Sequence, residues 1–135
     1  MSYIKFDKVT KNYGTGEVDI KALDEASFDI KKGELVVIVG PSGAGKTTAL
    51  NILGGMDSAS SGRVIVDNKN ISEYSKEKLT KYRRDDIGFV FQFYNLVQNL
   101  TAKENVELAT QICKKTLDPV EVLQKVGLKD RINNF

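Results

Sequence analysis

The first third of the chain alternates apolar and polar residues, as strands with one buried face do. The alternation covers residues 4–7 and residues 26–30. The segment KNYGTGEVD between them, residues 11–19, carries Asn, Asp and Gly, which are typical of turns. The sequence therefore predicts two strands near the start of the chain, each with one exposed face.

A different pattern follows, because residues 35–39 (LVVIV) are continuously apolar. Such a run is typical of a parallel strand covered on both faces, and we expect it in the middle of a sheet. After Gly45 the spacing of apolar residues becomes helical and ends at Gly54 and Gly55. GRVIVDN, residues 62–68, and IGFVFQ, residues 87–92, indicate two further short strands.

Three further segments of the chain are predicted to be helical. Residues 72–86 form a helix with a charged face in this interpretation. TAKE, residues 101–104, is a capping box that opens an amphipathic helix. DPVE, residues 118–121, supplies an N-cap Asp and a Pro at the first helical position, and Gly127 is a stop signal. Strands that alternate with helices indicate an α/β fold.

The amino-acid composition mainly excludes certain classes of partner and site. A chain of 135 residues with 41% apolar content predicts one domain, residues 1–135. The formal net charge of +2 favours no nucleic-acid partner. The sequence has one cysteine, Cys113, and no histidine, which excludes Cys/His zinc sites and histidine acid–base catalysis. The N-terminus lacks an apolar signal core, so we expect a soluble, cytoplasmic chain.

The main candidate for chemistry is GPSGAGKT, residues 40–47, which fits the pattern G-x-x-x-x-G-K-[ST] between a predicted strand and a predicted helix. In such a loop the backbone N–H groups point at phosphate oxygens, Lys46 reaches the β and γ phosphates, and the Thr47 hydroxyl binds Mg²⁺. The alternative is an ordinary glycine-rich turn with a surface lysine. The candidate nucleotide-binding residues in and after this loop are Gly40, Pro41, Ser42, Gly43, Ala44, Gly45, Lys46, Thr47 and Thr48.

The whole chain resembles the N-terminal part of an ABC-type ATPase, the nucleotide-binding domain that powers membrane transporters. The resemblance rests on KNYGTGEVDIKALDEASFDIKKGE, GPSGAGKTTALNILGGMDSASSGRV and RRDDIGFVFQFYNLVQNLTAKENVELA. These stretches are most similar to the branch that serves lipoprotein release, macrolide export and antimicrobial-peptide resistance. Thr47 replaces the commoner serine of the family and keeps the hydroxyl.

The resemblance also implies roles for two residues outside the loop. Tyr13 lies where the family has an aromatic ring that stacks on adenine, although by itself it is an ordinary turn aromatic. Gln92 lies where the family has a glutamine that contacts the metal and the attacking water and senses the membrane partner. The implied catalytic residues are therefore Lys46 and Gln92, and the implied metal-binding residues are Thr47 and Gln92.

Other family motifs are missing from the sequence. It contains no LSGGQ signature, no magnesium-binding Asp followed by a catalytic Glu, and no switch histidine. RVIVD, residues 63–67, imitates the strand before that Asp, but Asn68 follows it, and a strand ending in a turn is the favoured interpretation. NKNI, residues 68–71, lacks the Asp of guanine-reading motifs, so GTP specificity is not expected.

Together these features predict an α/β P-loop NTPase core with an N-terminal antiparallel β-subdomain and the start of a helical subdomain, apparently truncated. The implied function is binding and hydrolysis of ATP with Mg²⁺, coupled to export or extraction of a substrate by a membrane permease. The implied partners are the permease and a second copy in a head-to-tail dimer, at the inner face of the cell membrane. Two alternatives stay open: a nucleotide-binding fragment without hydrolysis, and an ABC ATPase that is not tied to a permease.

Overall fold

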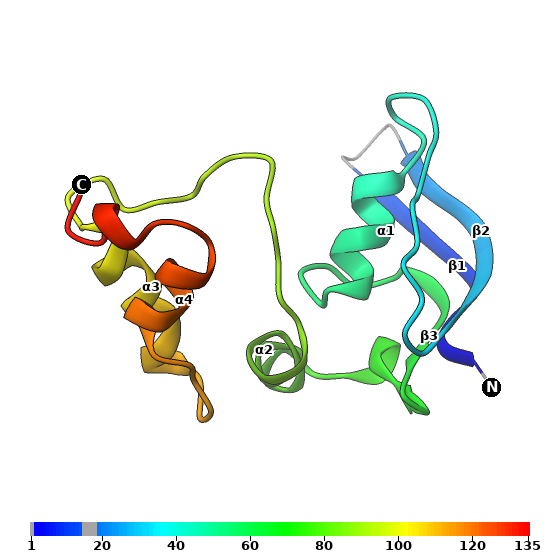
Figure 1. Ribbon diagram of the computed structural model, residues 1–135. Helices are drawn as coiled ribbons and strands as arrows, with labels where there is room; N and C mark the ends of the chain where they lie inside the picture. Colours follow the sequence, from blue (N-terminus) through cyan, green and yellow to red (C-terminus); the bar gives the residue numbers. More distant parts are fainter. Residues whose placement is uncertain (1, 15–18) are drawn as a thin grey trace. The chain divides into compact units, whose positions relative to one another are not determined.

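An antiparallel sheet of four strands, in the order β2-β1-β3-β4, forms the base of the first part of the chain (Figure 1). The strands are β1 (Ser2–Gly14), β2 (Asp19–Lys31), β3 (Ser61–Val66) and β4 (Lys69–Asn70). The computed structural model describes residues 2–14 and 19–135. The chain divides into two compact units, Met1–Arg83 and Arg84–Phe135. Part of the predicted turn, residues 15–18, lies outside the described residues.

The two predicted early strands are confirmed as β1 and β2, and both are longer than the alternating segments. Phe6 pairs with Phe28 across the ladder, and their rings stack with centroids 4.4 Å apart. Phe6, Val9 and Val64 are fully buried, so the core of the first unit lies along β1 and β3. The alternation in the sequence thus identified the buried face, because successive side chains of a strand point to opposite faces.

Helix α1 (Lys46–Leu53) covers the sheet with Ala49 and Ile52, which are both buried. Its predicted end is confirmed, since the Gly54 amide donates to Leu50 and the Gly55 amide donates to Ile52. The β3 prediction is also confirmed, and the strand ends in the positive-φ turn at Asp67 and Asn68. The strand-and-turn interpretation of residues 63–67 is therefore correct.

The helix predicted over residues 72–86 begins later than expected. A 3₁₀ turn, η1 (Ile71–Glu73), comes first, and α2 covers Lys76–Asp86. Tyr82 of α2 is buried, and its hydroxyl donates to the Leu53 carbonyl at 2.9 Å. This bond fixes α2 against the end of α1 within the first unit.

The second unit contains α3 (Ala102–Ile112), α4 (Pro119–Lys125) and the 3₁₀ turn η2 (Lys129–Arg131). The predicted capping box is confirmed, because Thr101 accepts from the Glu104 amide and Glu104 accepts from the Thr101 amide. The Glu104 carboxylate accepts from the Thr101 amide at 2.7 Å and from the Thr101 hydroxyl at 2.8 Å, and these two bonds, the first most strongly, lower the pKa of Glu104. Asp118 caps α4 by accepting from the Glu121 amide at 2.9 Å. None of the helices described in residues 2–14 and 19–135 is long and apolar enough to cross a membrane.

Two strand predictions are wrong at the level of local structure. Residues 35–39 and 87–92 carry no strand. A strand inside a parallel sheet needs hydrogen-bonded neighbours along both edges. Among the described residues, the ladders join only β1 with β2, β1 with β3 and β3 with β4.

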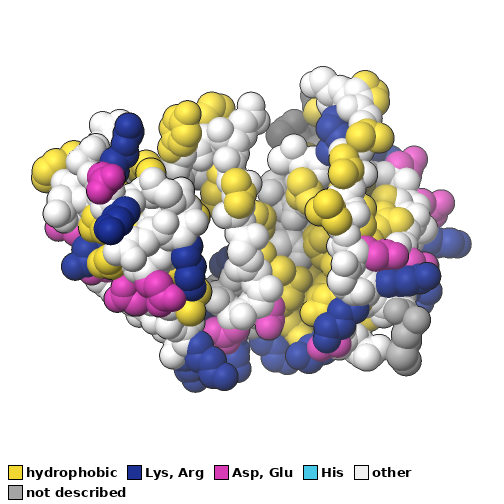
Figure 2. Space-filling view, in the orientation of Figure 1, with side chains coloured by type: hydrophobic (Ala, Val, Ile, Leu, Met, Phe, Trp, Pro, Cys, Tyr) yellow, Lys and Arg dark blue, Asp and Glu magenta, His cyan; other side chains and the backbone are white. Residues whose placement is uncertain are grey.

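The apolar side chains of residues 35–39 are consequently exposed. The exposed fraction of Leu35 is 96%, and Figure 2 shows apolar side chains open to solvent on this face of the first unit. A groove of about 470 Å³ runs between these residues, β2 and α1, and Phe28, Val37 and Ala49 contribute to its lining. The apolar run predicted a buried segment, but no other part of the described structure packs over it.

Candidate functional site

The loop of residues 40–45 leads directly into α1 and is shaped by two glycines with positive φ. Gly43 has φ 79° and Gly45, at the N-cap of α1, has φ 83°. A Cβ at Gly43 would meet nothing within 4 Å, whereas a Cβ at Gly45 would lie 2.2 Å from the Ala22 carbonyl oxygen of β2. The loop is thus open at its middle and packed tightly on the sheet where the helix begins.

Lys46 folds back over this loop. Its Nζ donates to the Gly40 carbonyl at 2.8 Å and to the Pro41 carbonyl at 2.6 Å. The Ala44 amide closes a turn onto Pro41 at 3.2 Å. The cation is therefore placed against the turn that the phosphate-loop interpretation assigns to phosphate.

The start of α1 leaves backbone donors available. The Ala49 amide bonds to the Gly45 carbonyl at 2.9 Å, and the first N–H groups of a helix have no intrahelical acceptor. No side chain caps this end, and no acidic residue lies in the first turn. Thr47 is exposed in that turn, so its hydroxyl is accessible to a cation. Free N–H groups, a lysine and a hydroxyl form a donor set that fits a phosphate group with Mg²⁺.

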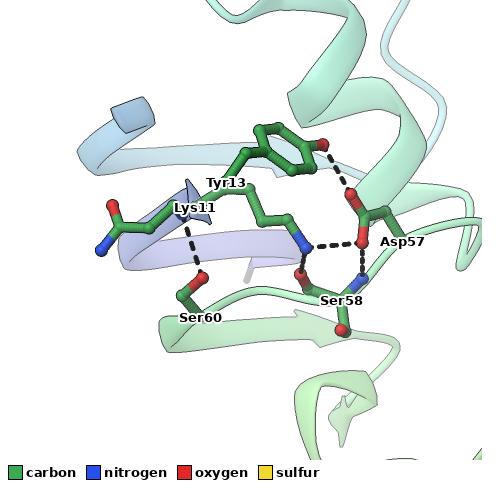
Figure 3. Close-up of polar contacts among 6 residues, drawn as sticks. Lys11, Tyr13, Asp57, Ser58 and Ser60 are labelled. Atoms are coloured by element: carbon green, nitrogen blue, oxygen red, sulfur yellow. Dashed lines mark hydrogen bonds and ion pairs between the residues drawn. The ribbon is translucent and has the colours of Figure 1, made fainter. Parts of the chain in front are cut away.

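Tyr13 ends β1 and comes close to this first turn. Its hydroxyl donates to the Asp57 carboxylate at 2.6 Å (Figure 3). That hydrogen bond, then burial and the charge of Asp57, raises the pKa of Tyr13, while a hydrogen bond with the Thr48 side chain opposes the shift. The structure therefore brings two predicted site residues together, Tyr13 from the sheet and Thr48 from α1.

Sequence reasoning did not identify two residues that contact Tyr13. Lys11 precedes it by two positions on the same strand face, and its Nζ lies 4.9 Å from the Tyr13 ring centroid. Asp57 follows α1 in a loop of Gly, Met and Ser. Lys11 could have been found from its spacing, because residues two positions apart in a strand lie on the same face. Asp57 could not, because a single Asp in a polar loop belongs to no recognisable pattern.

Gln92 belongs to the second unit, whereas the other candidate residues belong to the first. It is exposed, and the strand that was expected to end at it is not formed. The roles of Gln92 at a metal and at an attacking water therefore remain predictions.

Comparison with known proteins defines the family. A family model described as ABC transporter matches residues 23–135. An ABC transporter ATP-binding protein of Methanocaldococcus jannaschii, MJ0796, is 52% identical over 105 residues, which is 78% of this chain and 45% of the relative. The lipoprotein-releasing system ATP-binding protein LolD of Colwellia psychrerythraea is 37% identical over 93% of this chain and 51% of its own length.

The macrolide export ATP-binding/permease protein MacB of Hyphomonas neptunium is 38% identical over 97% of this chain and 21% of its own length. The chain thus spans about half the length of LolD and MJ0796 and a smaller share of MacB.

A solved structure gives the same result at the level of the fold. The dimeric post-hydrolysis state of the ATP-binding cassette MJ0796, bound to ADP and Pi, matches with a TM-score of 0.85 and 42% identity. The match covers 97% of this chain and 60% of that one, so it includes segments that form no strand here. The predicted fold class, a P-loop ABC ATPase with an antiparallel sheet and helices, is therefore confirmed. The chain belongs to the ABC transporter family, in which its relatives are ATP-binding proteins.

Proposed function

We propose that this chain binds Mg-ATP, with the phosphates at residues 40–48 and the adenine against Tyr13. The observation that carries the proposal is the geometry of the loop. Lys46 Nζ lies 2.8 Å and 2.6 Å from two loop carbonyls, next to the uncapped N-terminus of α1. A phosphate that enters the loop would replace those carbonyls as the partner of the ammonium group, and the helix dipole would favour its negative charge.

The residues have separate tasks in this proposal. The N–H groups of residues 43–48 bind and orient the phosphates, and Lys46 neutralises charge on the β and γ groups. Thr47 and Gln92 would hold Mg²⁺, which supplies charge neutralisation at the phosphate oxygens when it is bound. Gln92 would also orient the attacking water. Positioning and charge stabilisation of this kind account for most of the catalysis in phosphoryl transfer.

For the whole protein, we propose an ATP-binding subunit that couples ATP hydrolysis to export or extraction of a substrate by a membrane permease. Two relatives support export or extraction by their names, since LolD is a lipoprotein-releasing system protein and MacB is a macrolide export protein. Two solved structures of MJ0796 are dimeric, which supports pairing with a second copy. The subunit would then lie on the cytoplasmic side of the membrane.

The segment after Gln92 supports a protein partner, not nucleic acid. Phe93, Tyr94, Leu96 and Val97 are all exposed in the second unit. Aromatic and apolar side chains of this kind are enriched in protein interfaces, and the formal charge of +2 supplies no strong attraction for a nucleic-acid backbone.

The binding proposal is tested by thermal unfolding of the full chain with and without Mg-ATP. If ATP binds only the folded state, a hundredfold excess over the dissociation constant should add about 2.7 kcal/mol of stability. Lys46→Ala should remove most of this gain, and Lys69→Ala, an exposed lysine on β4, should keep it. A gain in Lys46→Ala equal to that of the wild type would contradict the proposal.

Hydrolysis by the chain alone is tested by phosphate release under saturating Mg-ATP. The 135 residues lack the catalytic Glu and the signature that the family resemblance requires. We therefore expect release no faster than that of Lys46→Ala. Turnover that depends on Lys46 would require a base among the residues present, and Asp67 is the first to substitute.

A further inference from the structure

The ring of Tyr13 is fixed at both its hydroxyl and one of its faces. The hydroxyl donates to Asp57 Oδ2 at 2.6 Å, and the Lys11 ammonium lies 4.9 Å from the ring centroid. Lys11 Nζ also donates to Asp57 Oδ1 at 2.6 Å, so the three residues, here named the Tyr13 cluster, form a closed set of contacts (Figure 3).

Asp57 is itself anchored to the backbone that follows α1. Its Oδ1 accepts from the Ser58 amide at 2.7 Å, and its own amide donates to the Asn51 carbonyl at 3.2 Å. Burial of Asp57 would raise its pKa, but the hydrogen bonds from Lys11, Tyr13 and Ser58 outweigh burial and lower it. The carboxylate therefore stays ionised and can accept from both sides of the cluster at neutral pH.

The ion pair in the cluster is more sheltered than others on the surface. The side chains of Lys11 and Asp57 are 12% and 27% exposed, whereas those of Lys21 and Asp24 in another pair are 58% and 64% exposed. Partial shelter strengthens a charge pair and reduces its screening by salt. The Lys11–Asp57 pair therefore restrains the position of the Tyr13 ring that both residues contact.

The ring remains available to a ligand despite these contacts. Tyr13 is 42% exposed, and Lys11 covers only one face. We expect a planar base to stack on the opposite face, while the cation keeps the ring from turning away. A ring that is already immobilised loses less conformational entropy when it binds, which is a gain in affinity without any new contact.

We propose that Lys11 and Asp57 are positioning residues that hold the Tyr13 ring ready to stack on the base of the bound nucleotide. This inference rests on the proposed binding of Mg-ATP at the loop of residues 40–48. Neither residue needs to touch the nucleotide, because each acts through Tyr13. Their substitution should therefore weaken binding of a nucleotide and leave binding of a bare phosphate chain unchanged.

The test compares dissociation constants for Mg-ATP and for magnesium tripolyphosphate, measured by calorimetry on the full chain. Asp57→Asn keeps the size of the side chain and removes its charge. Tyr13→Phe keeps the ring and the Lys11–Asp57 pair and removes the hydroxyl. Each should weaken ATP about two- to tenfold, the cost of immobilising one side chain, and should leave tripolyphosphate within error. Lys11→Met should likewise weaken ATP binding and leave tripolyphosphate binding unchanged.

Two matched controls separate these effects from general changes in charge. Asp7→Asn breaks an ion pair of the same length between β1 and β3, since Asp7 Oδ2 lies 2.6 Å from Arg63 Nη2. Lys32→Met removes another cation over a tyrosine ring, since Lys32 Nζ lies 5.8 Å from the ring centroid of Tyr3. Neither control should alter the ratio of the two dissociation constants.

The outcomes distinguish this inference from the proposed function. If the wild type binds ATP in a Lys46-dependent way but Asp57→Asn and Tyr13→Phe bind it equally well, the positioning role is refuted and ATP binding stands. Equal losses for ATP and tripolyphosphate would also refute it, because they would show a general structural effect. Failure of the wild type to bind either ligand would overturn both proposals. Should Asp57→Asn fail to fold by circular dichroism, Tyr13→Phe decides the question.

Discussion

Replacing Gly45 by alanine should destabilise the fold more than the same change at other glycines with positive φ. Gly45 has φ 83°, and an added Cβ would lie 2.2 Å from the Ala22 carbonyl oxygen and 2.9 Å from Leu23 Cδ2. Holding alanine in the left-handed region costs about 1–2 kcal/mol, and overpacking against backbone adds about 1–3 kcal/mol. We therefore expect Gly45→Ala to lower the free energy of unfolding by about 2–5 kcal/mol.

Gly43 and Gly33 supply the matched controls. They have φ 79° and 84°, and a Cβ at either would meet nothing within 4 Å. Alanine at these positions should cost about 1 kcal/mol, because the strain is partly offset by the lower entropy of the unfolded chain. The free energy of unfolding is measured by urea denaturation followed by far-ultraviolet circular dichroism. Equal losses in all three variants would refute the close packing of Gly45 on β2.

Three further outcomes follow from contacts in the two units. Tyr82→Phe should lower the stability of the first unit by about 1 kcal/mol in urea denaturation, because the bond to the Leu53 carbonyl is lost. Thr101→Ala should destabilise α3 by about 1 kcal/mol, seen as faster amide exchange in that helix, whereas Glu107→Gln should leave its capping box intact. The pKa of Asp57 is lowered from 3.8, so its contribution to stability is present above pH 4 and is lost as the pH falls further. Asp57→Asn should therefore lose less stability than the wild type below pH 4, and identical acid profiles would contradict this.

Local signals in the sequence determined much of what the structure contains. The alternation near the start of the chain predicted β1 and β2, since period 2 fixes which side chains face the core. The capping box at Thr101 and the Asp118 N-cap predicted the starts of α3 and α4, because a cap is a contact between near neighbours in sequence. The loop of residues 40–47 was predicted for the same reason, because its pattern and its geometry both lie within one short segment at the start of α1.

The tertiary structure decided the features that depend on distant partners. Residues 35–39 have the apolar character of a central strand, but a strand forms only where a neighbouring strand supplies hydrogen-bond partners for its backbone. In the part of the chain that the structure describes, residues 35–39 and 87–92 both lack such a neighbour and form no strand. The position of Tyr13 was likewise outside the reach of local patterns, because Asp57 lies 44 positions away in the chain and meets it only through the packing of α1 on the sheet. Sequence spacing specifies periodicity and caps, whereas hydrogen-bond partners that are remote in the chain exist only once the fold has brought them together.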